Sequence, residues 1–139
     1  MKPTNRQRWR FLIYLLRHKY YVLIYGLKLG GIPFSRLFFH DSDKLSTNFD
    51  HFALHYAGIK GKAQEYALKT HIYAHPHHYE GWFGERMDDP SRREMLVDWQ
   101  AANKAKRSPF TVAEFYLSKV DHTVIHPETL RWLEQQLGV

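Results

Sequence analysis

The chain has 139 residues, a formal net charge of +6 and no cysteine. This length is enough for one domain with a buried core, so residues 1–139 are expected to form a single domain. The absence of cysteine excludes disulfides, thiolate zinc sites and thiol nucleophiles, and it fits a reducing cytoplasm. Ten histidines in so short a chain, most of them between His40 and His78, favour a metal site.

Charge is unevenly distributed along the chain. The first forty residues contain no Asp or Glu and carry +8, so the remainder carries −2. A basic end of this kind attracts phosphates, nucleic acid or an anionic membrane, although a solvated basic helix explains the same pattern. The apolar stretches are interrupted by Arg17-His18-Lys19 and are too short to span a membrane. No secretory signal is recognisable, and a soluble, cytoplasmic protein without membrane contact is predicted.

The first predicted element is a long helix over residues 5–29. Apolar side chains recur there at close to helical spacing, and the Gly-Gly-x-Pro stretch at 30–33 ends the pattern. His18 falls within one turn of apolar residues and therefore points toward the packed side of this helix. A short helix over 34–39 follows, and it ends directly before His40 and Asp41.

Five further helices are predicted, over residues 46–56, 62–75, 91–103, 111–120 and 127–138. Capping boxes at 91–94 and 111–114 begin two of them, and Pro127 suits the first position of the last helix. Residues 101–108 are basic and polar, and a loop is expected there. The chain has no alternating strand pattern and no glycine-rich phosphate loop. The fold is therefore predicted to be all-α, with six or seven helices.

The functional prediction centres on residues 39–44, Phe-His-Asp-Ser-Asp-Lys. The adjacent His40 and Asp41 offer an imidazole nitrogen and a carboxylate, a combination that suits Zn, Mn, Fe, Ni or Co. Lys44 follows Asp41 by about one turn, so its ammonium group can reach the same cavity. Asp43 either orients His40 or lies in solvent.

Further candidate ligands follow downstream. His71 and His75 lie four residues apart on one helix, a spacing that can clamp zinc, and His77-His78 lie in the loop after it. Asp98 is flanked by Met, Val and Trp, and a carboxylate buried among such residues needs a cation. Glu94 lies one turn before Asp98 on the same face, and it is either a further ligand or only a cap of the helix.

The candidate ligands follow one another in the order His18, His40-Asp41, His71, His77-His78 and Asp98. Over roughly residues 15–100 this order resembles the HD superfamily of metal-dependent phosphohydrolases, whose ligands run His, His-Asp and a distant Asp. The resemblance implies that one metal is held by His18, His40, Asp41 and Asp98. It further implies that Asp41 bridges to a second metal, held by His71 with His77 or His78, and that Lys44 contacts a substrate phosphate.

The implied activity is hydrolysis of a nucleotide or another small phosphoester. It would use one or two divalent ions among Mn, Fe, Zn, Ni, Co and Mg, which lower the pKa of an attacking water. Asp41 and Lys44 would take part at the reacting phosphate. Two other classes remain open: a metal-dependent nuclease, and a module whose basic first helix binds nucleic acid while its histidines hold a structural metal.

The chain also resembles a small family of HD-like proteins from phages and bacteria. That family carries His-Asp-x-Ser-Lys, Asn-Pro-His-His-Trp and Glu-Met-x-x-Asp-Trp motifs. Residues 94–99 keep the third motif in full, whereas Asp43, His75 and Tyr79 stand where Ser, Asn and Trp are usual. His75 is therefore either a ligand or a polar neighbour of the ligands.

Overall fold

A computed structural model of the whole chain contains seven α-helices and no strand, which confirms the all-α prediction. The α-helices are α1 (Asn5–Leu29), α2 (Phe34–Phe38), α3 (Phe49–Tyr56), α4 (Lys62–Ala74), α5 (Asp89–Ala105), α6 (Val112–Lys119) and α7 (Pro127–Leu137). Three short 3-10 helices connect them: η1 (Ser42–Leu45), η2 (Tyr79–Trp82) and η3 (His122–Val124). No helix combines the length and the hydropathy that a membrane crossing requires.

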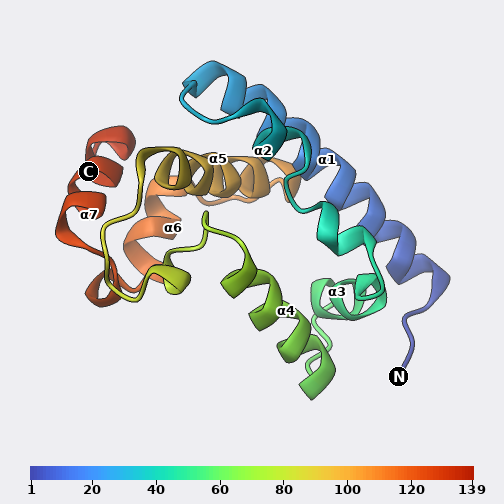
Figure 1. Cartoon of the computed structure of the whole chain (residues 1–139). Helices are drawn as coiled ribbons and strands as arrows, with labels where there is room; N and C mark the ends of the chain where they lie inside the picture. The colour runs from blue at the N-terminus through green and yellow to red at the C-terminus, as the bar shows by residue number, and fades with distance from the viewer.

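The two longest helices, α1 and α5, pack along each other and form the frame of the molecule (Figure 1). α1 begins at a capping box between Thr4 and Gln7 and ends at Gly30, whose φ of 73° is favourable for glycine. Near that end Gly26 faces α2, and a Cβ atom there would overlap the Leu37 side chain. The glycine thus lets α2 pack closely on α1, so that the residues after α2 lie beside α1.

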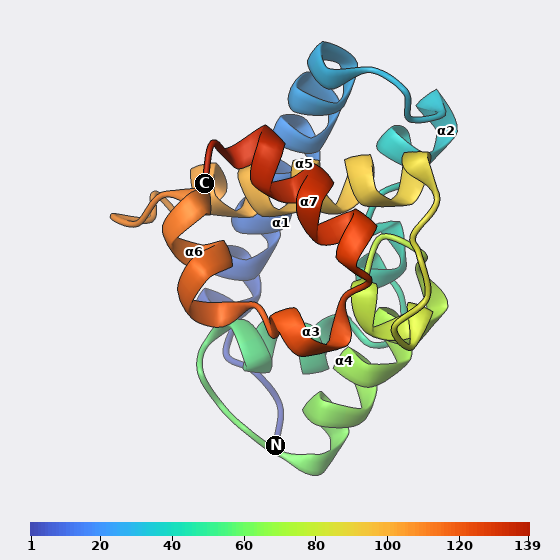
Figure 2. The same ribbon diagram turned by 90° about the vertical axis from the view of Figure 1, so that its left-hand side faces the viewer.

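The last two helices lie along one side of α5 (Figure 2). They enclose the largest apolar core, which contains Met87, Met95, Leu96, Tyr116, Val120, Ile125 and Leu133. The Tyr116 hydroxyl donates a hydrogen bond to Glu134 over 3.1 Å and so links α6 to α7. Leu117, the next residue of α6, is 60% exposed, because the adjacent Tyr116 faces inward.

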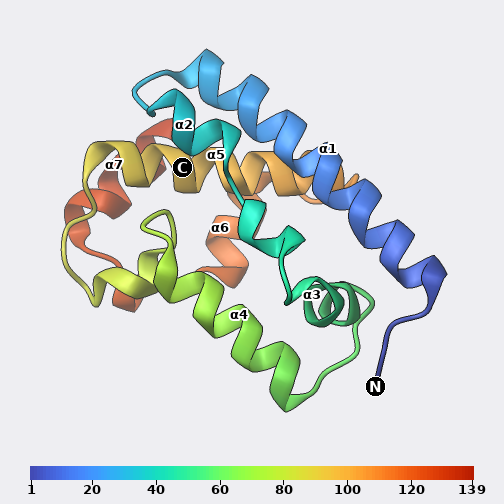
Figure 3. The same cartoon turned by 45° about the vertical axis from the view of Figure 1, so that its right-hand side comes forward.

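Helix α3 packs against the N-terminal half of α1, and α4 packs on α3 (Figure 3). Phe11 and Leu15 of α1 meet Phe52 and Ala53 of α3 and Ala67 of α4 in a second apolar cluster. The main contacts of α4 are with α3 and with η2 rather than with α1 or α5. α4 is therefore attached to the frame mostly through other short elements.

The structure corrects the predicted limits of two helices. α3 begins at Phe49 rather than at residue 46, because residues 46–48 form a bend and a turn after η1. α5 begins at Asp89, since the Asp88 side chain accepts the Ser91 N–H and acts as the N-cap. The predicted capping box at 91–94 is therefore wrong. α5 also continues to Ala105, through part of the predicted 101–108 loop.

Candidate metal centre

Four parts of the chain bring the seven predicted ligands together. They are α1 (His18), the turn after α2 (His40 and Asp41), α4 and the loop after it (His71, His77 and His78), and α5 (Asp98). Every one of them is buried except His78 and Asp98, which are partly buried. Residues far apart in sequence thus form one cluster of nitrogen and oxygen donors.

The first group of donors lies between α1, the α2 turn and α5. One Asp98 oxygen lies 2.9 Å from His18 Nε2 and 2.8 Å from His40 Nε2, and the two nitrogens are 3.2 Å apart. Ligands about 2.1 Å from a tetrahedral or octahedral ion are separated by about 3.0–3.4 Å. These donors are therefore spaced like the ligands of one ion.

Asp41 completes this group of donors, and its backbone conformation is unusual. Its φ of 56° lies in the left-handed region, which non-glycine residues seldom adopt and which is typical of functional sites. The turn directs one carboxylate oxygen, Oδ2, to within 3.4 Å of His18 Nε2. The other, Oδ1, lies 3.2 Å from His71 Nε2. Asp41 therefore lies between two groups of histidines.

The second group consists of His71, His77 and His78, which place one donor atom each within 4.8 Å of one another. The Nε2 atoms of His77 and His78 are buried and have no hydrogen-bond partner. Burial, with the nearby His77, lowers the pKa of His78 to about 3, so this ring is neutral at pH 7. Unpartnered buried nitrogens are unfavourable, whereas neutral imidazoles bind cations. The donors of this group thus fit a divalent metal.

Glu94 also belongs to the site, and the sequence left open whether this residue is a ligand or only a helix cap. His40 Nδ1 donates to its Oε1 over 3.0 Å, and Arg36 binds its Oε2 at 2.6 Å. Burial raises the pKa of Glu94, but the bonds from His40 and His77 outweigh it and lower the pKa to about 2. The ionised Glu94 thereby holds the His40 ring in the orientation in which Nε2 faces Asp98.

The possibility that Asp43 orients His40 is wrong. Asp43 Oδ2 lies 2.7 Å from His71 Nδ1 and 3.2 Å from His75 Nε2. It therefore orients the first histidine of α4, as Glu94 orients His40. His75 lies at the rim, partly exposed, and its nearest acidic partner is Asp43.

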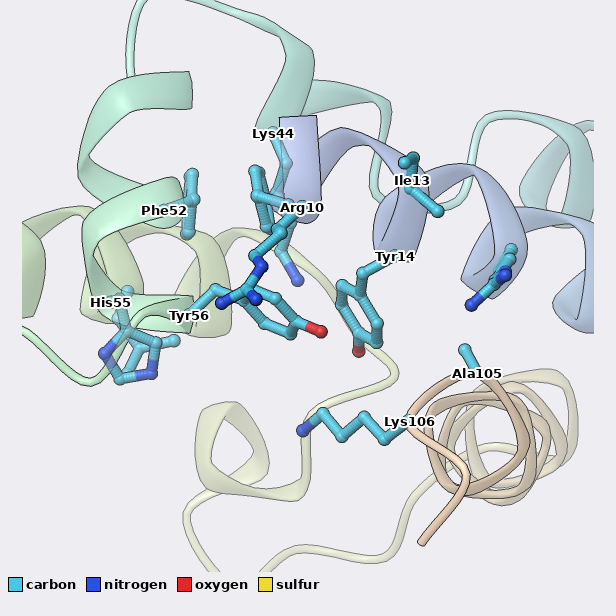
Figure 4. Close-up of a pocket in the computed structure, with 12 residues that line it drawn as sticks. Arg10, Ile13, Tyr14, Lys44, Phe52, His55, Tyr56, Ala105 and Lys106 are labelled. Atoms are coloured by element: carbon cyan, nitrogen blue, oxygen red, sulfur yellow. The ribbon is translucent and has the colours of Figure 1, made fainter. Parts of the chain in front are cut away.

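Two cavities border the cluster. A smaller one, of about 390 Å³, is lined by several site residues, among them Asp41, His77 and Glu94. A larger one, of about 870 Å³, contains no predicted metal ligand, but Lys44 belongs to its wall (Figure 4). Lys44 Nζ also lies 2.9 Å from Asp41 Oδ2, as the one-turn spacing predicted. This lysine therefore connects the metal centre with the larger cavity.

The comparisons with known proteins give a family but no function. No curated protein and no solved structure matches this chain. Residues 7–139 match the sequence model of a family of unknown function, and this range includes every residue of the candidate centre. The chain therefore belongs to that family, DUF5662.

Proposed function

We propose that this protein is a metal-dependent phosphohydrolase that acts on a nucleotide or another small phosphoester. The observation that carries the proposal is the position of Asp41 between the two histidine groups. Its Oδ2 lies 3.4 Å from His18 Nε2, and its Oδ1 lies 3.2 Å from His71 Nε2. A buried carboxylate so placed suits a bridge between two adjacent divalent ions.

The donor set favours transition metals. The first ion would be held by His18, His40, Asp41 and Asp98, and the second by Asp41, His71, His77 and His78. A bound divalent ion lowers the pKa of water and offsets charge on a phosphoryl oxygen. Imidazole nitrogens suit Mn, Fe, Co, Ni or Zn better than Mg, which prefers oxygen ligands.

The protein's own groups would act around the phosphate. Burial lowers the pKa of Lys44, but the charge of Asp41 more than compensates, so the pKa is raised and the ammonium form persists. This cation would bind a phosphate oxygen and offset charge as it develops. Glu94 would hold the His40 ring in place, and the larger cavity that Lys44 borders gives room for a small phosphoester.

The proposal is tested by metal content and hydrolysis together. Protein purified without a His tag is analysed by elemental mass spectrometry and assayed with p-nitrophenyl phosphate and nucleotides in the presence of each ion. We expect about one to two equivalents of a transition metal per chain. Asp41→Asn, whose side chain tolerates the left-handed backbone, should lose the metal and lower turnover by at least about 100-fold.

Asp50→Asn is the matched control, because Asp50 lies outside the centre and pairs with Arg8. It should keep both the metal and the activity. Full metal content and full turnover in Asp41→Asn would refute the proposal. So would the absence of bound metal after incubation with every candidate ion.

The basic first helix supports a second candidate, a metal-dependent nuclease. Arg6, Arg10 and Arg17 project from α1 as exposed side chains without a carboxylate partner, so they are free to contact a phosphate backbone. Cleavage of plasmid DNA without hydrolysis of mononucleotides would favour this alternative. Salt-sensitive DNA binding without any hydrolysis would instead favour a binding module.

A further inference from the structure

A large cavity lies beside the metal centre and is strongly basic. It has a volume of about 870 Å³ and is bounded by residues of α1, η1, α3, α4 and the C-terminal end of α5. Its lining includes four cationic side chains, Arg10, Arg17, Lys44 and Lys106, and not one carboxylate. The lining therefore selects for a negatively charged occupant.

Three of the four cations have no acidic partner. Lys44 pairs with Asp41, but Arg10, Arg17 and Lys106 form no salt bridge. Another arginine of α1 does have an acidic partner, because Arg8 makes two hydrogen bonds of 2.9 Å to Asp50. Partial burial and the charge of Lys44 lower the pKa of Lys106, as expected where like charges share a space. An anion in the cavity would relieve this repulsion.

Two tyrosines add hydrogen-bond donors to the same space. The rings of Tyr14 and Tyr56 stack with centroids 4.7 Å apart, and Lys106 Nζ lies 5.6 Å from the Tyr14 centroid. In Figure 4 the hydroxyls of Tyr14 and Tyr56 lie near each other, and the Lys106 side chain reaches into the space below them. Burial and the charges of Asp98 and Asp41 raise the pKa of Tyr14, so its hydroxyl stays protonated and can donate. Donors and cations thus surround the cavity.

We propose that this cavity holds the non-reacting phosphates of a small substrate that carries two or more of them, such as a nucleoside diphosphate or triphosphate. The inference rests on the proposed function, because Lys44 borders both the cavity and Asp41, where the reacting phosphate would lie. The cavity volume suits a small molecule. A nucleic-acid strand would instead need a groove that follows its backbone over several nucleotides.

A binding experiment tests this subsite without using catalysis. Tripolyphosphate and inorganic phosphate are titrated into metal-free protein by calorimetry at fixed ionic strength. We expect tripolyphosphate to bind at least about tenfold more tightly than phosphate, since it can engage several donors at once. The double variant Arg17→Gln/Lys106→Gln should weaken tripolyphosphate at least about tenfold. Binding should also raise the pKa of His55 in the cavity wall, measured by NMR.

The matched control removes the same charge from elsewhere. Arg6→Gln/Lys28→Gln takes two cations from α1 outside this cavity and should change tripolyphosphate affinity less than about twofold. Equal weakening by both double variants would mean general electrostatic attraction and would overturn the proposal. Equal affinity for phosphate and tripolyphosphate would also overturn it, as would tighter, cavity-dependent binding of a single-stranded oligonucleotide.

The subsite and the enzymatic activity can fail separately. If no phosphoester is hydrolysed but tripolyphosphate binding depends on Arg17 and Lys106, the subsite stands and the phosphohydrolase proposal falls. If p-nitrophenyl phosphate is hydrolysed but tripolyphosphate affinity does not depend on Arg17 and Lys106, only the subsite proposal is refuted. When both hold, Arg17→Gln/Lys106→Gln should raise the KM for a nucleoside triphosphate, whereas the control Arg6→Gln/Lys28→Gln should leave this KM unchanged.

Discussion

Glu94 Oε1 lies 3.0 Å from His40 Nδ1, on the opposite edge of the ring from the Nε2 atom that meets Asp98. Carboxylates that hold a ligating histidine in this way raise its basicity and fix its orientation. We therefore expect Glu94→Gln to weaken metal binding by about 10- to 100-fold while the stoichiometry at saturation is unchanged. Competition with a fluorescent chelator measures the affinity.

Glu114→Gln is the matched control, because Glu114 caps α6 away from the centre. It should leave metal affinity unaltered. Unaltered affinity in Glu94→Gln as well would show that the carboxylate does not support the ring. A loss of one equivalent at any metal concentration would show instead that Glu94 is itself a ligand.

Arg36 should stabilise the fold through the same carboxylate. Its guanidinium bonds Glu94 at 2.6 Å, and the Glu94 side chain is almost fully buried. Removing the cation leaves a buried charge poorly paired, so Arg36→Met should lower the free energy of unfolding by about 1–3 kcal/mol. Urea denaturation of the two single variants and of Arg36→Met/Glu94→Gln measures the coupling. Additive effects of the two substitutions would contradict a direct interaction.

Protons should compete with metal at His40. Burial lowers the pKa of this histidine, but the charge of Asp41 and the bonds to Asp98 and Glu94 raise it to about 10. In metal-free protein at pH 7, both ring nitrogens of His40 are therefore protonated. A bound ion must displace one of these two protons. Metal affinity should rise with pH. Calorimetric titrations in two buffers of different ionisation enthalpy should reveal proton release, and its absence would contradict the prediction.

The same pKa gives the sign of the stability change in metal-free protein. A histidine with a pKa of about 10 when folded and about 6.5 when unfolded stabilises the fold fully below pH 6.5. That contribution is lost as the pH rises toward 10. The melting temperature of chelator-treated protein should therefore fall over this range, and metal-loaded protein should show a smaller decrease. A melting temperature that rises with pH would contradict the assignment.

Gly26 should tolerate no side chain while Leu37 is present. A Cβ atom would overlap the Leu37 side chain at the contact of α1 with α2, so Gly26→Ala should destabilise the protein by about 1–3 kcal/mol. In the Leu37→Ala background this penalty should disappear, because the space is then free. Thermal unfolding of the four proteins completes the cycle. An equal penalty in both backgrounds would show that the overlap is not the cause.

Local sequence signals predicted the helices well. The limits of α1 were predicted at both ends, because its apolar spacing and the following glycines are local features. The capping box at Thr111 and the proline at the start of α7 were confirmed for the same reason. The capping box at 91–94 failed because Asp88, three residues earlier, competes for the Ser91 N–H.

The candidate ligands were found from residue types and order, but their partners were not. Glu94 lies 54 positions from His40, and Asp43 lies 28 positions from His71. The spacing of residues within one helix does not predict such contacts, because they depend on how the helices pack against one another. The basic cavity is also a tertiary feature, since Lys106 lies far in sequence from the α1 arginines. The net charge of α1 can be counted from the sequence, but the cavity that its side chains line cannot be predicted from it.

The attachment of α4 implies that the two halves of the centre differ in local stability. α1 and α5 pack along each other and hold the His18 and Asp98 side, whereas α4 contacts mainly α3 and η2. Elements with few contacts to the frame open before the molecule unfolds globally. Amide hydrogens of α4 should therefore exchange with solvent sooner than those of α5. An ion held by His71, His77 and His78 would be the first to leave, and its binding would slow exchange chiefly in α4.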